Sequence, residues 1–369
     1  MINTLKKLLT KIPSVSGRES GVRDIITGLM RPLVDEFKSD AMGNLICRKK
    51  GSGSAPRKVM LCAHMDEIGF IVTFIEENGY LRVAPVGGIH YGAAAFSEVV
   101  FENGVRGLLV PEADVPAKET PKAEKCYVDI GATTRREAER RMMIGDCCAL
   151  VPHLTRLTAN RVAGRPLDDR IGCAVLVEIA ETLRNPADDM YYVFSVQEEV
   201  GCRGARPAAF AISPDLALIY DVTGTGDEQG AKPMAVRLGE GVAIKIKDNS
   251  VICDRDLVAA LLGSAKANGI AAQCEILTYG GTDTSSVQMT GFGCKAGALS
   301  IPSRYIHSGV ELVDLRDANA AVALTLAYLG GAKCLNFQRS CLPLPMRRRR
   351  RSRKSLTISK KYHTRTPPA

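Results

Sequence analysis

The sequence lacks any long apolar run, although 46% of its 369 residues are hydrophobic. No stretch approaches the ~20 apolar residues that a membrane-spanning helix needs. The first residues, MINTLKKLLTKIPSVSG, carry charges and lack the apolar core of a signal peptide. The twelve cysteines are scattered and form no CxxC pair, which argues against a zinc ribbon or a thioredoxin motif. We therefore expect a globular, cytoplasmic protein with reduced thiols and no membrane partner.

The sequence also has little net charge outside its C-terminal end. The whole chain has a formal charge of +9, but eleven Lys and Arg residues and no Asp or Glu lie from Arg339 onward. The rest therefore carries about −2, without the basic excess that would favour nucleic acid. We predict a basic, disordered tail at 336–369. It could contact nucleic acid or another anionic surface, be a solvated extension, or reflect a frameshifted end of the gene; we favour the last two.

Apolar runs alternate with amphipathic stretches over most of the chain. RKVMLCAH, MYYVFSVQ and LALIYD predict buried strands, and DDRIGCAVLVEIAETLRN predicts a helix capped by Asp. DRDLVAALLGSAKANG predicts a helix closed by Gly269, and ELVDLRDANAAVALTLAYLGG predicts a final helix. The alternation predicts an α/β fold whose mostly parallel sheet is covered by helices.

A stretch of different texture interrupts this alternation. From about residue 71 to 158, short apolar runs are separated by Gly, Pro and charged turns, which is typical of a small β-rich domain. The expected organisation is a discontinuous α/β domain, 1–70 with 159–335, an inserted β-rich domain, 71–158, and the tail.

Histidines and acids stand at the ends of the apolar runs or at the start of a helix. Ligand sites of open α/β sheets form at the carboxyl ends of the strands, so these side chains are expected to converge. An adjacent acid pair beside a buried strand costs desolvation free energy unless cations neutralise it. The residues concerned are His64, Asp168, Asp169, Glu198, Glu199, Asp221 and His307.

This donor set favours divalent metal. Imidazole nitrogen and carboxylate oxygen without thiolate suit zinc, cobalt or manganese. There are more donors than one catalytic ion needs, and two ions that share a bridging carboxylate would account for the surplus. Taken singly, Asp168 could be only a helix cap and Asp221 only a turn residue, and the remaining histidines are interpreted as structural: His90, His153 and His363.

Six ordered motifs in the chain resemble metallopeptidase family 42, the tetrahedral, glutamyl-aminopeptidase-like dizinc aminopeptidases. The resemblance runs from near the N-terminus to about residue 335, and the motifs are AHMDEIGF, LDDRIG, QEEVGCRGA, IYDVT, GGTDTSS and IPSRYIHS. It implies that Asp168 bridges two metal ions. The remaining implied ligands are His64 and Asp221 for one ion, and Glu199 and His307 for the other.

The resemblance also implies roles for neighbouring acids. Glu198 would be the general base that takes a proton from the metal-bridging water. Because consecutive strand residues point in opposite directions, the two glutamates are not expected to ligate one ion. Asp66 would orient the imidazole of His64, and Asp169 would support the turn around the bridging Asp. Asp283 would lie in a loop of the substrate pocket, or be an ordinary turn residue.

The implied activity is removal of the N-terminal residue from short peptides. The implied architecture is an α/β catalytic domain with an inserted dimerisation domain, in homo-oligomers that reach a dodecamer by analogy. A dizinc deacylase or amidase on the same scaffold is the nearest rival. An endoglucanase-type hydrolase fits less well, because adjacent glutamates are poorly placed on either side of one bond. A nucleic-acid-binding protein acting through its tail would leave the donor set without a purpose.

Overall fold

The computed structural model describes residues 1–9, 13–116 and 118–330. The predicted basic tail, 336–369, lies outside the described residues. Within them, no helix is long and apolar enough to cross a bilayer.

Among the described residues, eleven strands form one large sheet, with the order β1-β2-β12-β3-β13-β16-β17-β11-β10; β14 joins β16 off this path and carries β15. The strands are β1 (Glu36–Ser39), β2 (Leu45–Lys49), β3 (Lys58–His64), β10 (His153–Arg156), β11 (Arg161–Arg165), β12 (Asp189–Ser195), β13 (Leu216–Thr223), β14 (Val242–Lys247), β15 (Ala272–Ile276), β16 (Ala296–Arg304) and β17 (Glu311–Asp314).

The sheet is mixed, so the expectation of a mostly parallel sheet was wrong: four of the described pairings are parallel and six are antiparallel. The neighbouring strands β12, β3, β13 and β16 run parallel, as does the outlying pair β14–β15. All the other pairings are antiparallel: β1–β2, β2–β12, β14–β16, β16–β17, β17–β11 and β11–β10. An apolar run indicates burial but not the direction of its neighbour, which depends on long-range pairing.

Helices cover both faces of the central strands, as predicted. They are α1 (Ile2–Leu8), α2 (Ser20–Met30), α5 (Arg170–Thr182), α6 (Ala205–Ile212), α7 (Arg255–Asn268), α8 (Asp283–Gln288) and α9 (Leu315–Gly330). Met60 and Cys62 of β3 pack with Ala205 and Ala209 of α6. Because strand side chains alternate between faces, Leu61 points to the other side, where α5 packs on β3.

Two helix ends follow the local chemistry of the sequence. The side chain of Asp169 accepts the N–H of Gly172 and caps α5. Gly269 closes α7 in the left-handed conformation at φ 62°. The predicted final helix is shorter than expected, because its first four residues form strand β17, which pairs with β11 and β16.

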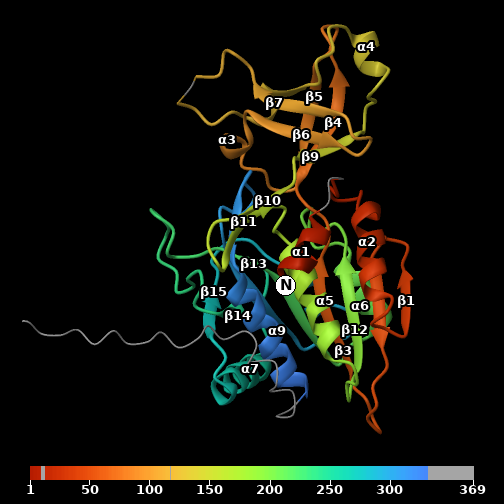
Figure 1. The fold of residues 1–369 in the computed structure, drawn as a ribbon, viewed down its shortest axis with the longest axis vertical. Helices are drawn as coiled ribbons and strands as arrows, with labels where there is room; N and C mark the ends of the chain where they lie inside the picture. The colour runs from red at the N-terminus through yellow and green to blue at the C-terminus, as the bar shows by residue number, and fades with distance from the viewer. Residues whose placement is uncertain (10–12, 117, 331–369) are drawn as a thin grey trace, which may run out of the picture. The chain divides into compact units, whose positions relative to one another are not determined.

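Six further strands close into a barrel, with the order β4-β5-β8-β7-β6-β9 and antiparallel pairing throughout (Figure 1). These strands are β4 (Gly69–Ile75), β5 (Leu81–Val86), β6 (Ser97–Phe101), β7 (Arg106–Pro111), β8 (Cys126–Asp129) and β9 (Cys147–Leu150). The barrel has its own apolar core, which includes Phe70, Phe101 and Leu109. Short helices α3 (Tyr91–Ala94), η1 (Ala123–Lys125) and α4 (Arg135–Glu139) connect its strands.

Candidate metal centre

His64 ends β3, and its imidazole is buried against two acids. The Nε2 atom lies 3.1 Å from Oδ1 of Asp168 and 3.8 Å from Oδ1 of Asp221. Asp221 comes from the parallel neighbour β13, which continues for two residues beyond it. Adjacent parallel strands thus bring a histidine and an acid together at their carboxyl ends, as the sequence predicted.

Asp168 lies between β11 and the start of α5, with 7% of its side chain exposed. Its backbone N–H donates to the buried carboxylate of Glu311 at 3.0 Å, and the N–H of Leu167 donates to the same oxygen. Glu311, on β17, therefore fixes the backbone that presents Asp168. No sequence pattern indicated this role, because Glu311 lies inside a stretch that was predicted to be helical.

His307 meets the other oxygen of Asp168. Its Nε2 atom lies 3.3 Å from Oδ2 of Asp168 and 3.0 Å from Oε2 of Glu199. His307 stands in the loop after β16 with a left-handed φ of 61°. Arg165 holds this loop, because its buried guanidinium donates to the carbonyls of Ser308 and Ile68. The two histidines therefore face separate oxygens of one carboxylate.

The donor geometry fits divalent ions. A tetrahedral zinc with ligands at 2.0–2.1 Å separates neighbouring donors by about 3.3 Å. The donor atoms of each triad lie within 4.8 Å of one another, and the triads are His64, Asp168 and Asp221, and Asp168, Glu199 and His307. The residues present therefore fit the divalent metal ions that the sequence implied.

The electrostatics of the triads also call for positive charge. Burial opposes protonation of His307, but hydrogen bonds to Asp168 and Glu199 raise its pKa to about 11. The pKa of His64 is raised well above its usual value by its three acid neighbours, against the effect of burial. Protonation of the imidazoles and binding of cations would each neutralise the same excess of buried carboxylate charge.

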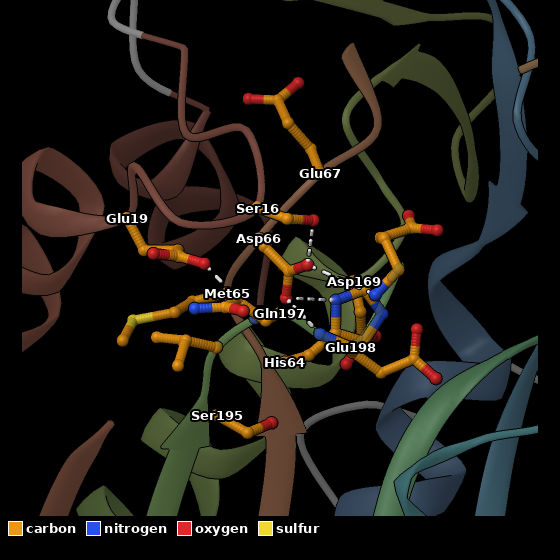
Figure 2. Close-up of polar contacts among 12 residues, drawn as sticks. Ser16, Glu19, His64, Met65, Asp66, Glu67, Asp169, Ser195, Gln197 and Glu198 are labelled. Carbon is orange, nitrogen blue, oxygen red and sulfur yellow. Dashed lines mark hydrogen bonds and ion pairs between the residues drawn. The ribbon is translucent and has the colours of Figure 1, made fainter. Parts of the chain in front are cut away.

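Asp66 connects His64, at the end of β3, to the acid pair Glu198 and Glu199. Its Oδ1 atom accepts the backbone N–H of Glu198 at 3.0 Å and lies 3.5 Å from Nδ1 of His64. Its Oδ2 atom accepts the N–H of Glu199 and the hydroxyl of Ser16. Figure 2 shows the Asp66 carboxylate between Ser16, His64 and the turn that carries Glu198. This buried carboxylate thus contacts both segments of the site.

Glu198 and Glu199 lie in a turn after β12, so the expectation that they are consecutive strand residues was wrong. Their side chains nevertheless diverge. Glu199 contacts His307, whereas Oε1 of Glu198 accepts the thiol of Cys202 at 3.1 Å. Burial raises the pKa of the Glu198 carboxyl well above its usual value, and neighbouring acids add to the shift.

A cavity of about 1090 Å³ lies over these residues. Its lining includes His64, Asp168, Glu198, Glu199, Asp221 and His307. His90, interpreted from sequence as structural, also lines it, as does Gly88. A β-carbon added to Gly88 would lie 3.2 Å from Nδ1 of His307, so the loop after β5 passes close to His307. Asp283 does not line this cavity among the described residues, although the sequence suggested a pocket role.

The fold and the clustered donors define a metal-dependent hydrolase: an α/β sheet with histidines and acids gathered under a cavity. The sequence model of the M42 glutamyl aminopeptidase family matches residues 43–324. A relative from Acetivibrio thermocellus is 45% identical over 324 residues, covering 88% of this chain and 97% of the relative. The lysyl aminopeptidase of Pyrococcus furiosus is 38% identical, covering 90% and 98%.

Among solved structures, the TET1 peptidase of Pyrococcus horikoshii has a TM-score of 0.79 and 34% identity, covering 89% of this chain and 98% of that chain. The chain therefore belongs to the M42 glutamyl aminopeptidase family. It is a metal-dependent aminopeptidase, and the resemblance seen in its motifs is confirmed.

Proposed function

We propose that the chain removes N-terminal residues from short peptides with two divalent ions in each subunit. The observation that carries the proposal is the position of Asp168, whose two oxygens face His64 and His307 separately. In this proposal, Asp168 is shared, His64 and Asp221 hold one ion, and Glu199 and His307 hold the other. Zinc is the proposed metal; cobalt and manganese would accept the same nitrogen and oxygen donors.

Glu198 is the proposed general base. Bound divalent metal would lower the pKa of water and polarise the substrate carbonyl. Glu198 would take a proton from the attacking water and return it to the leaving amine, which requires a carboxyl placed in the cavity but free of the metal ligands. Its contact with Cys202, its position in the cavity lining and its raised pKa support this role.

Asp66 is the proposed positioning residue of the centre. It holds the backbone of both glutamates through two N–H groups and faces the Nδ1 side of His64. Both interactions orient side chains that would touch the metal or the water. Asp169 is proposed to support the same turn, since it caps α5 immediately after Asp168.

The test is hydrolysis of a panel of chromogenic aminoacyl substrates, each with a free or an acetylated α-amine. The wild type should cleave the substrates that have a free α-amine, lose this activity when a chelator is added, and contain two metal ions per subunit. Glu198→Gln should lose activity while it keeps both ions, and Glu181→Gln, at an exposed position of α5, is the matched control. Preferred cleavage of acetylated substrates would favour a deacylase, and hydrolysis that survives metal removal would overturn the proposal.

We further propose that the insertion predicted at 71–158 is a dimerisation domain within the α/β domain, 1–70 with 159–335. The structure shifts these bounds slightly: the barrel begins with β4 at Gly69 and ends with β9 at Leu150, whereas β10 (His153–Arg156) belongs to the large sheet. The closed barrel with its own core supports this division. The barrel segment also exposes large apolar side chains to different extents, namely Phe74, Phe96, Leu108, Met143 and Ile144. The Pyrococcus horikoshii relative is described as assembling into a tetrahedron or a large octahedral shell. Light scattering of the full chain would test for a homo-oligomer, with a monomer as the contrary result.

A cytoplasmic location is part of the proposal. Ten cysteines among the described residues are free, and the cytosol keeps such thiols reduced. No role is assigned to the basic tail, and nucleic-acid binding through it, which the sequence analysis did not favour, concerns only residues outside the described ones.

A further inference from the structure

Cys202 places a thiol beside the proposed base. It lies four residues after Glu198 in the turn that follows β12, with a left-handed φ of 53°. Its Sγ atom donates a hydrogen bond to Oε1 of Glu198 at 3.1 Å, and the half-buried side chain lines the cavity. A thiophilic ion that enters the cavity therefore meets a sulfur ligand next to a carboxylate.

A second buried acid completes this group. Asp283 begins α8 with 1% of its surface exposed, and its Oδ2 atom accepts the hydroxyl of Ser195 at 2.6 Å. Its Oδ1 atom is buried without a hydrogen-bond partner. A buried carboxylate oxygen without a partner is costly, and a cation would satisfy it. This orphaned oxygen is the independent sign that the group is suited to a positively charged ligand.

The spacing fits one ion. A carboxylate oxygen of Asp283, a carboxylate oxygen of Glu198 and the sulfur of Cys202 all lie within 4.8 Å of one another. With metal–sulfur and metal–oxygen bonds of about 2.3 and 2.1 Å, tetrahedral geometry needs a sulfur–oxygen separation of about 3.6 Å. Small side-chain rotations would satisfy that geometry.

The chemistry of this group differs from that of the metal-ligand triads. The triads offer only nitrogen and oxygen, whereas the third group offers a sulfur that prefers soft or borderline ions such as cadmium and zinc. Binding would replace the thiol proton by the metal, and that proton would pass to water. No oxidation or reduction is needed.

We propose that Glu198, Cys202 and Asp283 form a third, inhibitory cation site that takes thiophilic divalent ions such as cadmium or excess zinc. Occupation ties the Glu198 carboxylate to the ion and removes it from proton transfer. The binding claim is independent of the proposed function, but the inhibitory consequence rests on Glu198 being the base.

Cadmium is the probe, because its bond to a thiolate produces an ultraviolet charge-transfer absorption that nitrogen and oxygen ligands do not. The protein is first loaded with its catalytic ions and then titrated with cadmium. The wild type should gain the thiolate absorption and lose peptidase activity over the same cadmium range. Cys202→Ala should lose the absorption and resist inhibition, measured against its own cadmium-free rate. Cys274→Ser is the matched control, because Cys274 is an exposed thiol elsewhere, and it should behave as the wild type.

The carboxylates are tested separately. Glu198→Gln and Asp283→Asn should each weaken cadmium binding, read from the absorption alone, and circular dichroism should confirm that each variant is folded. Equal cadmium absorption in the wild type and Cys202→Ala would overturn the site. Unchanged cadmium affinity in folded Glu198→Gln would overturn the three-ligand arrangement. A wild type that shows the Cys202-dependent absorption but hydrolyses no peptide would refute the proposed function and leave the ion site standing.

Discussion

The Oδ1 atom of Asp66 accepts the backbone N–H of Glu198 at 3.0 Å, although 131 residues lie between them in the chain. The same oxygen lies 3.5 Å from Nδ1 of His64. One buried carboxylate thus sets both the position of the proposed base and the orientation of a proposed metal ligand. Because it accepts from two backbone N–H groups and one hydroxyl, a neutral amide cannot replace it without placing N–H groups against donors.

Asp66→Asn should therefore lower both metal affinity and kcat. Loss of a residue that orients a metal ligand typically costs about 10–100-fold in either quantity. Metal affinity by competition with a chelating dye and kcat at saturating metal are the two measurements. Ser16→Ala, which removes only one donor to the same carboxylate, should have a smaller effect. Equal effects from the two variants would contradict the central role given to Asp66.

Gly88→Ala should disturb His307 from the opposite side. The added β-carbon would lie 3.2 Å from Nδ1 of His307, so the imidazole must move by a few tenths of an ångström relative to Asp168 and Glu199. We expect the ion proposed to bind Glu199 and His307 to lose affinity by about tenfold or more. Titration with metal, followed by calorimetry, measures the affinity of each ion.

Gly92→Ala is the matched control for that substitution. Gly92 is also in the segment after β5, but its β-carbon would find its nearest neighbour at an ordinary 3.5 Å. Unchanged affinity in Gly88→Ala would mean that His307 does not depend on the barrel-side loop.

The sequence singled out the proposed metal ligands because their signal is local. His64 and Asp221 stand at or near the ends of apolar runs that became adjacent parallel strands, β3 and β13. Asp169 and Gly269 marked helix ends by capping chemistry that needs no distant partner. Local patterns of this kind can be interpreted without knowing which distant segments of the chain pair.

The parts that the sequence did not predict depend on distant pairing. Glu311 was assigned to a helix but lies in β17, where pairing with β11 decides its conformation. Arg165 contacts the carbonyl of Ser308, 143 residues away in the chain, and the sequence around neither residue predicts this contact. The approach of Gly88 to His307 likewise appears only after the barrel and the sheet have formed.

Metal removal should lower the thermal stability of the chain. The three carboxylates of the triads lie buried together, and bound cations relieve their mutual repulsion. A ligand present at about 1,000 times its Kd stabilises the folded state by about 4 kcal/mol. Differential scanning fluorimetry with and without a chelator should therefore show a clear fall in Tm for the wild type.

Asp168→Asn is the informative variant for that experiment. It removes the shared carboxylate charge, so its Tm should respond much less to the chelator. Glu198→Gln should respond as the wild type does, because Glu198 is outside both triads. A wild-type Tm that does not change when the chelator is added would contradict the proposed metal centre.

Asp317 should give the folded state a pH dependence that is separate from the metal centre. Its buried carboxyl accepts the N–H groups of Gly239 and Gly241, and burial raises its pKa from 3.8 to about 7. Between these values the unfolded chain releases the proton while the folded chain keeps it. The contribution of Asp317 to stability is therefore complete below about pH 4 and is lost as the pH rises towards 7.

The loss approaches about 1.4 kcal/mol per pH unit within that window. Asp317→Asn cannot titrate, so the difference in unfolding free energy between wild type and variant should shift against the wild type by about 2 kcal/mol from pH 5 to pH 7. Urea unfolding at saturating metal measures it. Asp256→Asn, at an exposed position of α7, controls for the loss of a carboxylate and should follow the wild type. A wild-type-minus-Asp317→Asn difference that stays constant with pH would show that Asp317 ionises equally in both states.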